Sequence, residues 1–150
     1  GQSIRELKED YFKEILYIGH KDSLELTLSV FDNLSFFLSL NDTRVVRQKL
    51  NEKLEIFGLE NALDRIVGEL SVGQRRKVAL TRLFFERGKP LWFLDEPLTA
   101  LDKESAQTVA LLIQGQTKFG AVVYTTHQDI TLDIEPTNNL TLDIAKEMTK

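Results

Sequence analysis

Three short segments with a fixed order constrain this 150-residue chain more than any other feature. The first is Leu-Ser-Val-Gly-Gln at 70–74, the second is Leu-Trp-Phe-Leu-Asp-Glu-Pro at 91–97, and the third ends at His127. About one helix separates the first segment from the second, and one helix and one strand separate the second from the third. Because buried strands alternate with helices, the order predicts an α/β fold with right-handed crossovers.

Apolar runs define the expected strands. Residues 15–18, 91–94 and 121–124 are apolar or aromatic throughout, which predicts buried strands. The run at 91–94 is typical of a parallel strand that is covered on both faces. Residues 140–144 alternate between apolar and polar side chains and predict an edge strand. The expected sheet is therefore mostly parallel.

Residues that favour helix N-termini stand before the expected helices. Ser71 and Gln74 match the S-x-x-Q capping box, in which each side chain bonds the backbone of the other residue. Ser29, followed three residues later by Asp32, predicts another helix start, and Asp102 predicts a third. A further helix is expected to begin at Asn41 or Asp42 and to end at Gly58, with four core contacts: Val45, Leu50, Leu54 and Ile56.

The composition excludes several classes of site. The chain has no cysteine, which rules out disulfides and thiolate metal sites, and its two histidines are far apart in sequence. The net charge of −4 gives no electrostatic case for nucleic acid. The basic cluster at 75–77 is expected to be a solvated helix face or a patch that faces phosphate. No apolar run approaches the roughly 18 residues that span a bilayer.

Two pairs of residues in these segments are candidates for a functional site. Asp95 and Glu96 follow a buried strand, at the end where open α/β sheets bind their ligands. They could hold a metal and orient water for phosphoryl transfer, or they could only cap the loop before Pro97. Ser71 and Gly73 lie at a helix N-terminus, which is an anion site as well as a capping position. The two roles are compatible, because the cap fixes the helix end that would meet phosphate.

A phosphate-binding loop of the G-x-x-x-x-G-K-[ST] type is absent from the 150 residues. The only Gly-Lys pair is Gly88-Lys89. Pro90 follows this pair, and Leu83 stands five positions before Gly88, where the loop requires glycine. This pair is therefore not a phosphate-binding loop.

Taken in order, the three segments resemble the second half of the ATPase domain of ABC transporters. Within that family, residues 17–20, 74–83 and 125–128 are similar to the ATP-binding subunit of the cytochrome c biogenesis haem exporter, the CcmA type. The resemblance implies a P-loop-NTPase-like, mostly parallel sheet with an inserted helical signature subdomain. It also implies that the fold is incomplete at the N-terminus, because the P-loop is missing.

The resemblance implies a division of the chain as well. Residues 1–150 would form the C-terminal two-thirds or more of one ABC ATPase domain. The helical subdomain is expected at about 29–88, and the α/β core at 1–28 and 89–150. The chain is thus expected to be truncated before residue 1, and this fragment is expected to be inactive by itself.

The resemblance assigns three residues to hydrolysis. Asp95 is expected to bind Mg²⁺ through water, and Glu96 is expected to be the general base for the attacking water. His127 is implied to be the switch histidine, which contacts the γ-phosphate and holds the catalytic geometry. ATP and Mg²⁺ are the cofactors implied.

Five further residues are implied to contact nucleotide. Ser71, Gly73 and Gln74 would bind the γ-phosphate of a nucleotide held by the opposite subunit, and Asp102 would reach across the dimer interface while it caps its helix. His20 stands where most ABC domains have a glutamine that contacts Mg²⁺ and water. It could contact metal-bound water or only cap the preceding strand.

The expected function is ATP binding and hydrolysis for an ABC exporter that drives haem export or delivery in cytochrome c maturation. The implied partners are a second ATPase subunit in a head-to-tail dimer and integral membrane transporter subunits. Haem would be met only indirectly, and nucleic acid is not expected. The protein is expected at the cytoplasmic or organellar-matrix face of the inner membrane. Two alternatives are an ATPase subunit of another ABC exporter and a non-catalytic interaction module without the phosphate-binding loop.

Overall fold

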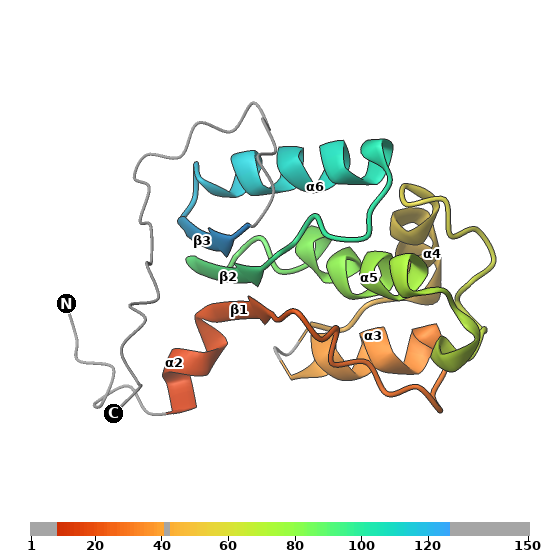
Figure 1. Ribbon diagram of the computed structural model, residues 1–150. Helices are drawn as coiled ribbons and strands as arrows, with labels where there is room; N and C mark the ends of the chain where they lie inside the picture. The colour runs from red at the N-terminus through yellow and green to blue at the C-terminus, as the bar shows by residue number, and fades with distance from the viewer. Residues whose placement is uncertain (1–8, 41–42, 127–150) are drawn as a thin grey trace, which may run out of the picture.

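The computed structural model describes residues 9–40 and 43–126 of the chain. Strands and helices alternate along these residues, and the strands lie side by side although helical segments separate them in sequence (Figure 1). The elements in chain order are α2 (Glu9–Lys13), β1 (Ile15–Ile18), α3 (Val30–Ser39), α4 (Arg47–Glu55), the 3-10 helix η1 (Val67–Glu69), α5 (Val72–Leu80), the 3-10 helix η2 (Thr81–Phe84), β2 (Leu91–Asp95), α6 (Lys103–Gln116) and β3 (Ala121–Thr125).

The three strands form one parallel sheet in the order β1–β2–β3. β1 matches its predicted residues, and β2 and β3 each extend one residue beyond theirs. Asp95, the last residue of β2, aligns with Thr125 of β3. The carboxyl ends of all three strands therefore meet at one edge of the sheet. The mixed α/β class with a parallel sheet is confirmed, whereas the strand expected at 140–144 lies outside the described residues.

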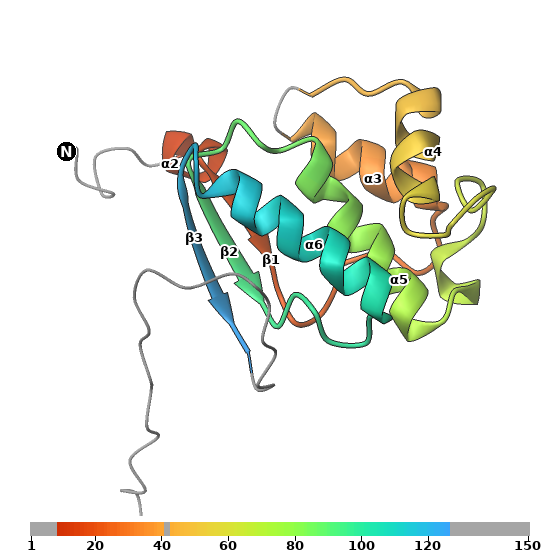
Figure 2. The same cartoon turned by 90° about the horizontal axis from the view of Figure 1, so that it is seen from above.

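Helices α3, α5 and α6 cover one face of the sheet, and α2 lies at its amino end (Figure 2). On that face, Leu16 of β1 and Trp92 of β2 are fully buried. On the other face, Tyr17 is 61% exposed and Val123 is 51% exposed. The predictions that β2 is covered on both faces and that β3 is buried are wrong for this part of the chain, because α3, α5 and α6 all lie on the same side.

A continuous hydrophobic core joins the helices to the sheet. Trp92 lies in this core, and its indole Nε1 donates to the carbonyl oxygen of Glu86 at 3.3 Å. Burial of each core leucine contributes about 1.5–3 kcal/mol relative to an exposed side chain. The fully buried leucines from β1, α3, α4, α5 and η2 are Leu16, Leu34, Leu38, Leu50, Leu54, Leu80 and Leu83.

Three of the predicted helix starts are confirmed by their hydrogen bonds. The Ser29 side chain accepts from the Asp32 amide at 3.0 Å, and the Asp102 side chain accepts from the Ser105 amide at 2.9 Å. Ser71 and Gln74 form the complete capping box. Because such caps depend on neighbours three residues apart, the sequence alone is enough to find them.

The start predicted for α4 is wrong. The helix begins at Arg47 after Val46, which has extended backbone angles and no side-chain cap. At this start, Arg47 pairs with Asp64 and stacks on the ring of Phe31 at 4.3 Å. Leu50 and Leu54 are buried and Val45 is partly buried, as expected. Ile56, however, is 42% exposed, and Asn41 and Asp42 lie outside the described residues.

A buried ion cluster lies near the amino ends of β1 and β2. Glu86 accepts from Arg82 Nε at 3.2 Å and lies 3.8 Å from the ammonium of Lys89. Burial raises the pKa of Glu86 and lowers the pKa of Arg82 and of Lys89. The Lys89 ammonium also donates to the carbonyl oxygen of Lys13 at 2.6 Å. The cluster therefore joins η2 to the segment before β1.

Candidate functional site

Asp95 lies at the carboxyl edge of the sheet and receives a hydrogen bond at each carboxylate oxygen. Thr125 Oγ1 donates to its Oδ1 at 2.6 Å, and the backbone amide of His20 donates to its Oδ2 at 3.2 Å. The Thr125 hydroxyl is the main cause that lowers the pKa of Asp95, and the His20 amide adds to the effect. The group is ionised at neutral pH, with lone pairs left for a cation or for metal-bound water.

Glu96 adopts a left-handed backbone conformation, with φ +48°. Non-glycine residues adopt such angles at a cost, so the surrounding structure has to hold them. The Glu96 amide donates to Thr125 Oγ1 at 3.0 Å, and the Thr99 hydroxyl donates to Glu96 Oε2 at 2.9 Å. This geometry turns the Glu96 side chain out of the strand and leaves it partly accessible.

His20 lies beside both acids in the loop that follows β1. Its Nδ1 is 3.8 Å from Glu96 Oε2, and its backbone amide bonds Asp95. The His20 side chain is 66% exposed, so its imidazole can reach a ligand at this edge. The parallel order of β1 and β2 thus brings together three residues that the sequence singled out. The fourth, His127, lies outside the described residues.

Arg76 holds the backbone beneath this edge. Its guanidinium donates to the carbonyl oxygens of Asp95 at 2.7 Å and of Glu96 at 2.9 Å, and also to Gly19 O and Asp22 Oδ1 at 2.8 Å each. Arg76 is 4% exposed. The expectation of a solvated or phosphate-facing cluster at 75–77 is therefore wrong for Arg76, because carbonyl groups from two loops surround it.

The N-terminus of α5 forms a second part of the candidate site. Ser71 and Gln74 bond each other's backbone in the capping box, and Ser71 remains exposed. A Cβ atom at Gly73 would lie 2.8 Å from the carbonyl oxygen of Ala100. The loop from β2 to α6 connects this contact to the acid pair (Figure 2). Gly73 is thus required for a close approach of two backbone segments, besides any approach of phosphate.

Asp102 lies at the end of the same loop. Its carboxylate caps α6 through the Ser105 amide and pairs with the Lys77 ammonium. The bond from Lys77 is the main cause that lowers the pKa of Asp102 far below its usual range. Lys77 also donates to the carbonyl oxygen of Phe57 at 3.1 Å. The capping role expected of Asp102 is confirmed.

The donor set at the sheet edge is compatible with Mg²⁺ held by few protein ligands. Among the described residues, no group of three or more His, Asp or Glu side chains could hold a metal ion together. Mg²⁺ usually keeps several waters and binds one or two carboxylates plus substrate phosphates. The ionised Asp95 carboxylate meets that requirement, and Glu96 remains for a different task.

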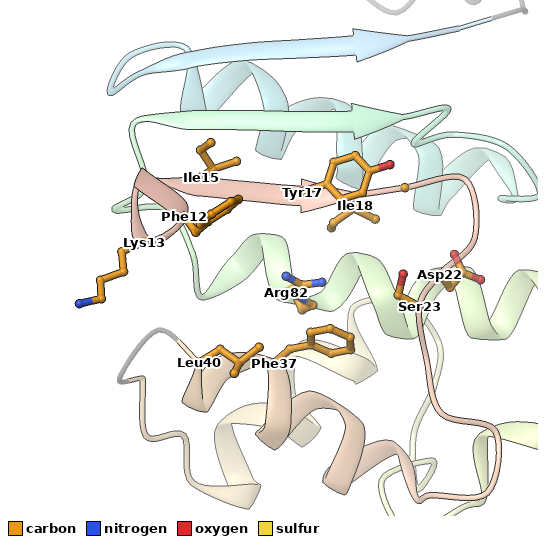
Figure 3. A pocket seen from close by; sticks show the side chains of 11 residues that line it. Phe12, Lys13, Ile15, Tyr17, Ile18, Asp22, Ser23, Phe37, Leu40 and Arg82 are labelled. Atoms are coloured by element: carbon orange, nitrogen blue, oxygen red, sulfur yellow. The ribbon is translucent and has the colours of Figure 1, made fainter. Parts of the chain in front are cut away.

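A pocket of about 490 Å³ lies on the outer side of β1, between α2 and α3 (Figure 3). Apolar and aromatic side chains form most of its walls. Arg82 lies at its base, where the guanidinium stacks on Phe37 at 4.3 Å. The residues that line it are Phe12, Lys13, Ile15, Tyr17, Ile18, Gly19, Asp22, Ser23, Phe37, Leu40 and Arg82.

Sequence comparison defines the class of this protein. The ABC transporter family matches residues 1–99, so the chain belongs to that family. It is 39% identical over 127 residues to the cytochrome c biogenesis ATP-binding export protein CcmA of Vibrio cholerae, which covers 84% of this chain and 61% of that protein. It is 40% identical over 130 residues to CcmA of Yersinia pestis, covering 86% of this chain and 59% of that protein. The chain therefore spans about three fifths of the curated relatives that it matches.

Solved structures agree with the fold. A structure described as the ATP-binding subunit of an ABC transporter has a TM-score of 0.74 and 23% identity, covering 85% of this chain and 54% of that chain. A dimeric ATP-binding cassette bound to ADP and phosphate has a TM-score of 0.66 and 22% identity, covering 85% and 58%. No helix within the described residues is long and apolar enough to cross a membrane.

Reasoning from sequence missed the residues that hold the acids in place. Thr125 bonds both acids because the ends of β2 and β3 are in register. That register could have indicated Thr125, since Asp95 and Thr125 each follow directly after a predicted strand. Arg76 and Asp22 are 54 positions apart, and no local pattern joins them.

Proposed function

We propose that the complete protein is the ATP-binding and ATP-hydrolysing subunit of an ABC exporter. The observation that carries this proposal is the meeting of Asp95, Glu96 and His20 at the carboxyl edge of a parallel sheet, in a chain of the ABC transporter family. The residues 1–150 then form the C-terminal two-thirds or more of one ATPase domain. The segment at about 29–88 is its helical subdomain, and 1–28 with 89–150 form its α/β core.

Each acid has its own role in this proposal. Mg²⁺, when bound with ATP, supplies the positive charge that neutralises the phosphates. Asp95 would hold the metal through a water molecule, as suits a carboxylate that stays ionised. Glu96 accepts the proton of the attacking water, and its bond from Thr99 fixes the carboxylate that does so. His127 would contact the γ-phosphate, and His20 would contact water bound to the metal.

A second copy of the protein completes the site. Ser71, Gly73 and Gln74 bind the γ-phosphate of the nucleotide held by the opposite subunit, because a helix N-terminus with an exposed hydroxyl attracts anions. Asp102 reaches across the interface of this head-to-tail dimer while it continues to cap α6. The 150 residues contain no Gly-rich phosphate loop, so this segment alone is inactive in our proposal.

The pocket beside β1 is the place for a membrane partner. Phe36 of α3 is 58% exposed and contacts Phe37 of the pocket wall, and Leu40, directly after α3, lines the pocket and is 60% exposed. A short segment of an integral membrane transporter subunit fits an apolar surface of this kind. The protein is then a peripheral subunit at the cytoplasmic or organellar-matrix face of the inner membrane, held there by its partner.

The similarity to relatives named CcmA supports a role of the complete protein in cytochrome c maturation. ATP binding closes the dimer and hydrolysis reopens it, and this cycle drives haem export or delivery for attachment to apocytochrome c. The ATPase subunit meets haem only indirectly, because the membrane subunits handle it.

The variant Glu96→Gln in the complete protein tests the ATPase proposal. It keeps the size of the side chain and its acceptor for Thr99 but removes the base, so hydrolysis should fall by about 10²–10⁴-fold while ATP binding persists. Glu104→Gln, an exposed position on α6, is the matched control and should hydrolyse ATP normally. Normal hydrolysis by Glu96→Gln would show that another group is the base.

Deletion of the gene for the complete protein tests the assignment to cytochrome c. Membranes of the deletion strain should lack haem covalently bound to c-type cytochromes, and the wild-type gene should restore it. The Glu96→Gln gene should fail to restore it. A normal level of covalently bound haem in the deletion strain would rule out the role in cytochrome c maturation. The protein would then be proposed as the ATPase subunit of another ABC exporter.

A further inference from the structure

Arg76 is a buried cation that joins two loops of the candidate site. It lies in the middle of α5 with 4% of its surface exposed, and its guanidinium makes four hydrogen bonds. Two of them go to the loop after β1, at Gly19 O and Asp22 Oδ1. The other two go to the carbonyl oxygens of Asp95, the last residue of β2, and of Glu96, which follows it.

The hydrogen bonds of Arg76 hold the two loops in a fixed position relative to each other. A buried guanidinium is costly unless its donors are paired, and Asp22 is the carboxylate that pairs with it here. The remaining acceptors are three backbone carbonyls, which cannot rotate away as side chains can. Any shift of one loop against the other therefore breaks a charge-assisted hydrogen bond in a buried place.

The same guanidinium supports the strained backbone at Glu96. Its Nη2 bonds the carbonyl groups on both sides of the residue with φ +48°. Thr125 Oγ1 accepts from the Glu96 amide on the opposite side. Strained conformations of this kind persist only where the surroundings determine them from several directions. Arg76 supplies two of those constraints.

We propose that Arg76 is a positioning residue that fixes the His20 loop against the Asp95–Glu96 backbone, so that both move together with α5. It contacts neither the metal nor the nucleotide; it acts through the carbonyl groups it holds. Its catalytic consequence rests on the proposed ATPase function, whereas its effect on the two loops does not. Gly19 and Asp22 also line the pocket beside β1, so a segment that fills this pocket presses on the loop that Arg76 holds.

The test uses the complete protein with Arg76→Met, which keeps the length of the side chain without its donors. ATP hydrolysis should lose about tenfold to 10²-fold in kcat, as expected when reacting groups are misplaced by about 1 Å, while KM for ATP changes by less than about threefold. Arg76→Lys, which keeps the charge and some of the donors, should recover part of kcat. Lys49→Met, an exposed position on α4, is the matched control and should retain kcat.

A second readout needs no hydrolysis. Amide hydrogen exchange, followed by NMR without nucleotide, should become faster at His20 and Glu96 in Arg76→Met, because both amides are held in the arrangement that Arg76 supports. Asp22→Asn, which keeps the acceptor but removes the charge, should show the same change to a smaller extent. If the wild-type protein hydrolyses no ATP, the proposed function fails, and exchange still decides the role of Arg76.

Two results would overturn the proposal. One is a folded Arg76→Met protein with unchanged exchange at His20 and Glu96. The other is a loss of activity in Arg76→Met that a general loss of protein stability fully explains, with no recovery of activity in Arg76→Lys. In either case Arg76 would be a buried side chain without a positioning role.

Discussion

Glu86 is the only acid in the buried Arg82–Glu86–Lys89 cluster of the described residues, and its neutralisation makes the sharpest stability prediction. The side chain of Glu86 is 1% exposed, and those of Arg82 and Lys89 are 10% and 8% exposed. Glu86→Gln keeps the shape of the side chain but leaves two buried cations with no anion between them. Removal of one partner from a buried ion pair costs about 3–5 kcal/mol. Because Lys89 keeps its bond to the Lys13 carbonyl, we expect about 3 kcal/mol.

The assay is urea unfolding of the complete protein, followed by tryptophan fluorescence, since Trp92 lies against the cluster. Glu60→Gln, an exposed loop position, is the matched control and should change the free energy of unfolding by less than about 0.5 kcal/mol. The double variant Glu86→Gln/Lys89→Met should regain part of the loss, because one uncompensated cation is removed. A loss below about 0.5 kcal/mol for Glu86→Gln would refute this electrostatic reasoning.

Three further outcomes are expected. Gly73→Ala should cost about 1–3 kcal/mol of unfolding free energy in thermal or urea unfolding, because its Cβ would meet the Ala100 carbonyl oxygen, whereas Gly88→Ala, in open space, should be tolerated. The lowered pKa of Asp102 contributes stability above about pH 4 that is lost as pH falls, so Asp102→Asn should flatten the acid side of the stability curve. Phe36→Asp on α3 should abolish transport in a reconstituted exporter and leave basal ATP hydrolysis intact, and crosslinks of the membrane partner only to 121–126 would contradict that docking surface.

Local patterns were sufficient to predict much of the fold. The strands at 15–18 and 91–94 follow from apolar runs, and the start of α5 follows from Ser71 and Gln74. Each of these signals acts over a few neighbouring residues, so the tertiary structure has little chance to override it. The parallel order then brings His20 to Asp95 without further information.

Contacts between distant segments could not be predicted in the same way. α4 begins without a side-chain cap, and its first residue, Arg47, contacts Asp64 and Phe31 from two other segments. In the sequence, Arg76 is one of three consecutive basic residues on a predicted helix. Its carbonyl partners come from distant segments, so only the tertiary structure reveals them. The exposure of Val123 depends on which segments cover the second face of the sheet, and an apolar run alone does not specify that.

In the proposed function, the carboxyl edge of β2 binds a metal–nucleotide complex through Asp95. Electron paramagnetic resonance of Mn²⁺, used in place of Mg²⁺ with the complete protein and ATP, tests it most directly. We predict ATP-dependent Mn²⁺ binding that is weakened in Asp95→Asn and retained in Glu96→Gln and in the exposed control Asp64→Asn. Equal Mn²⁺ binding by wild-type protein and Asp95→Asn would contradict the claim.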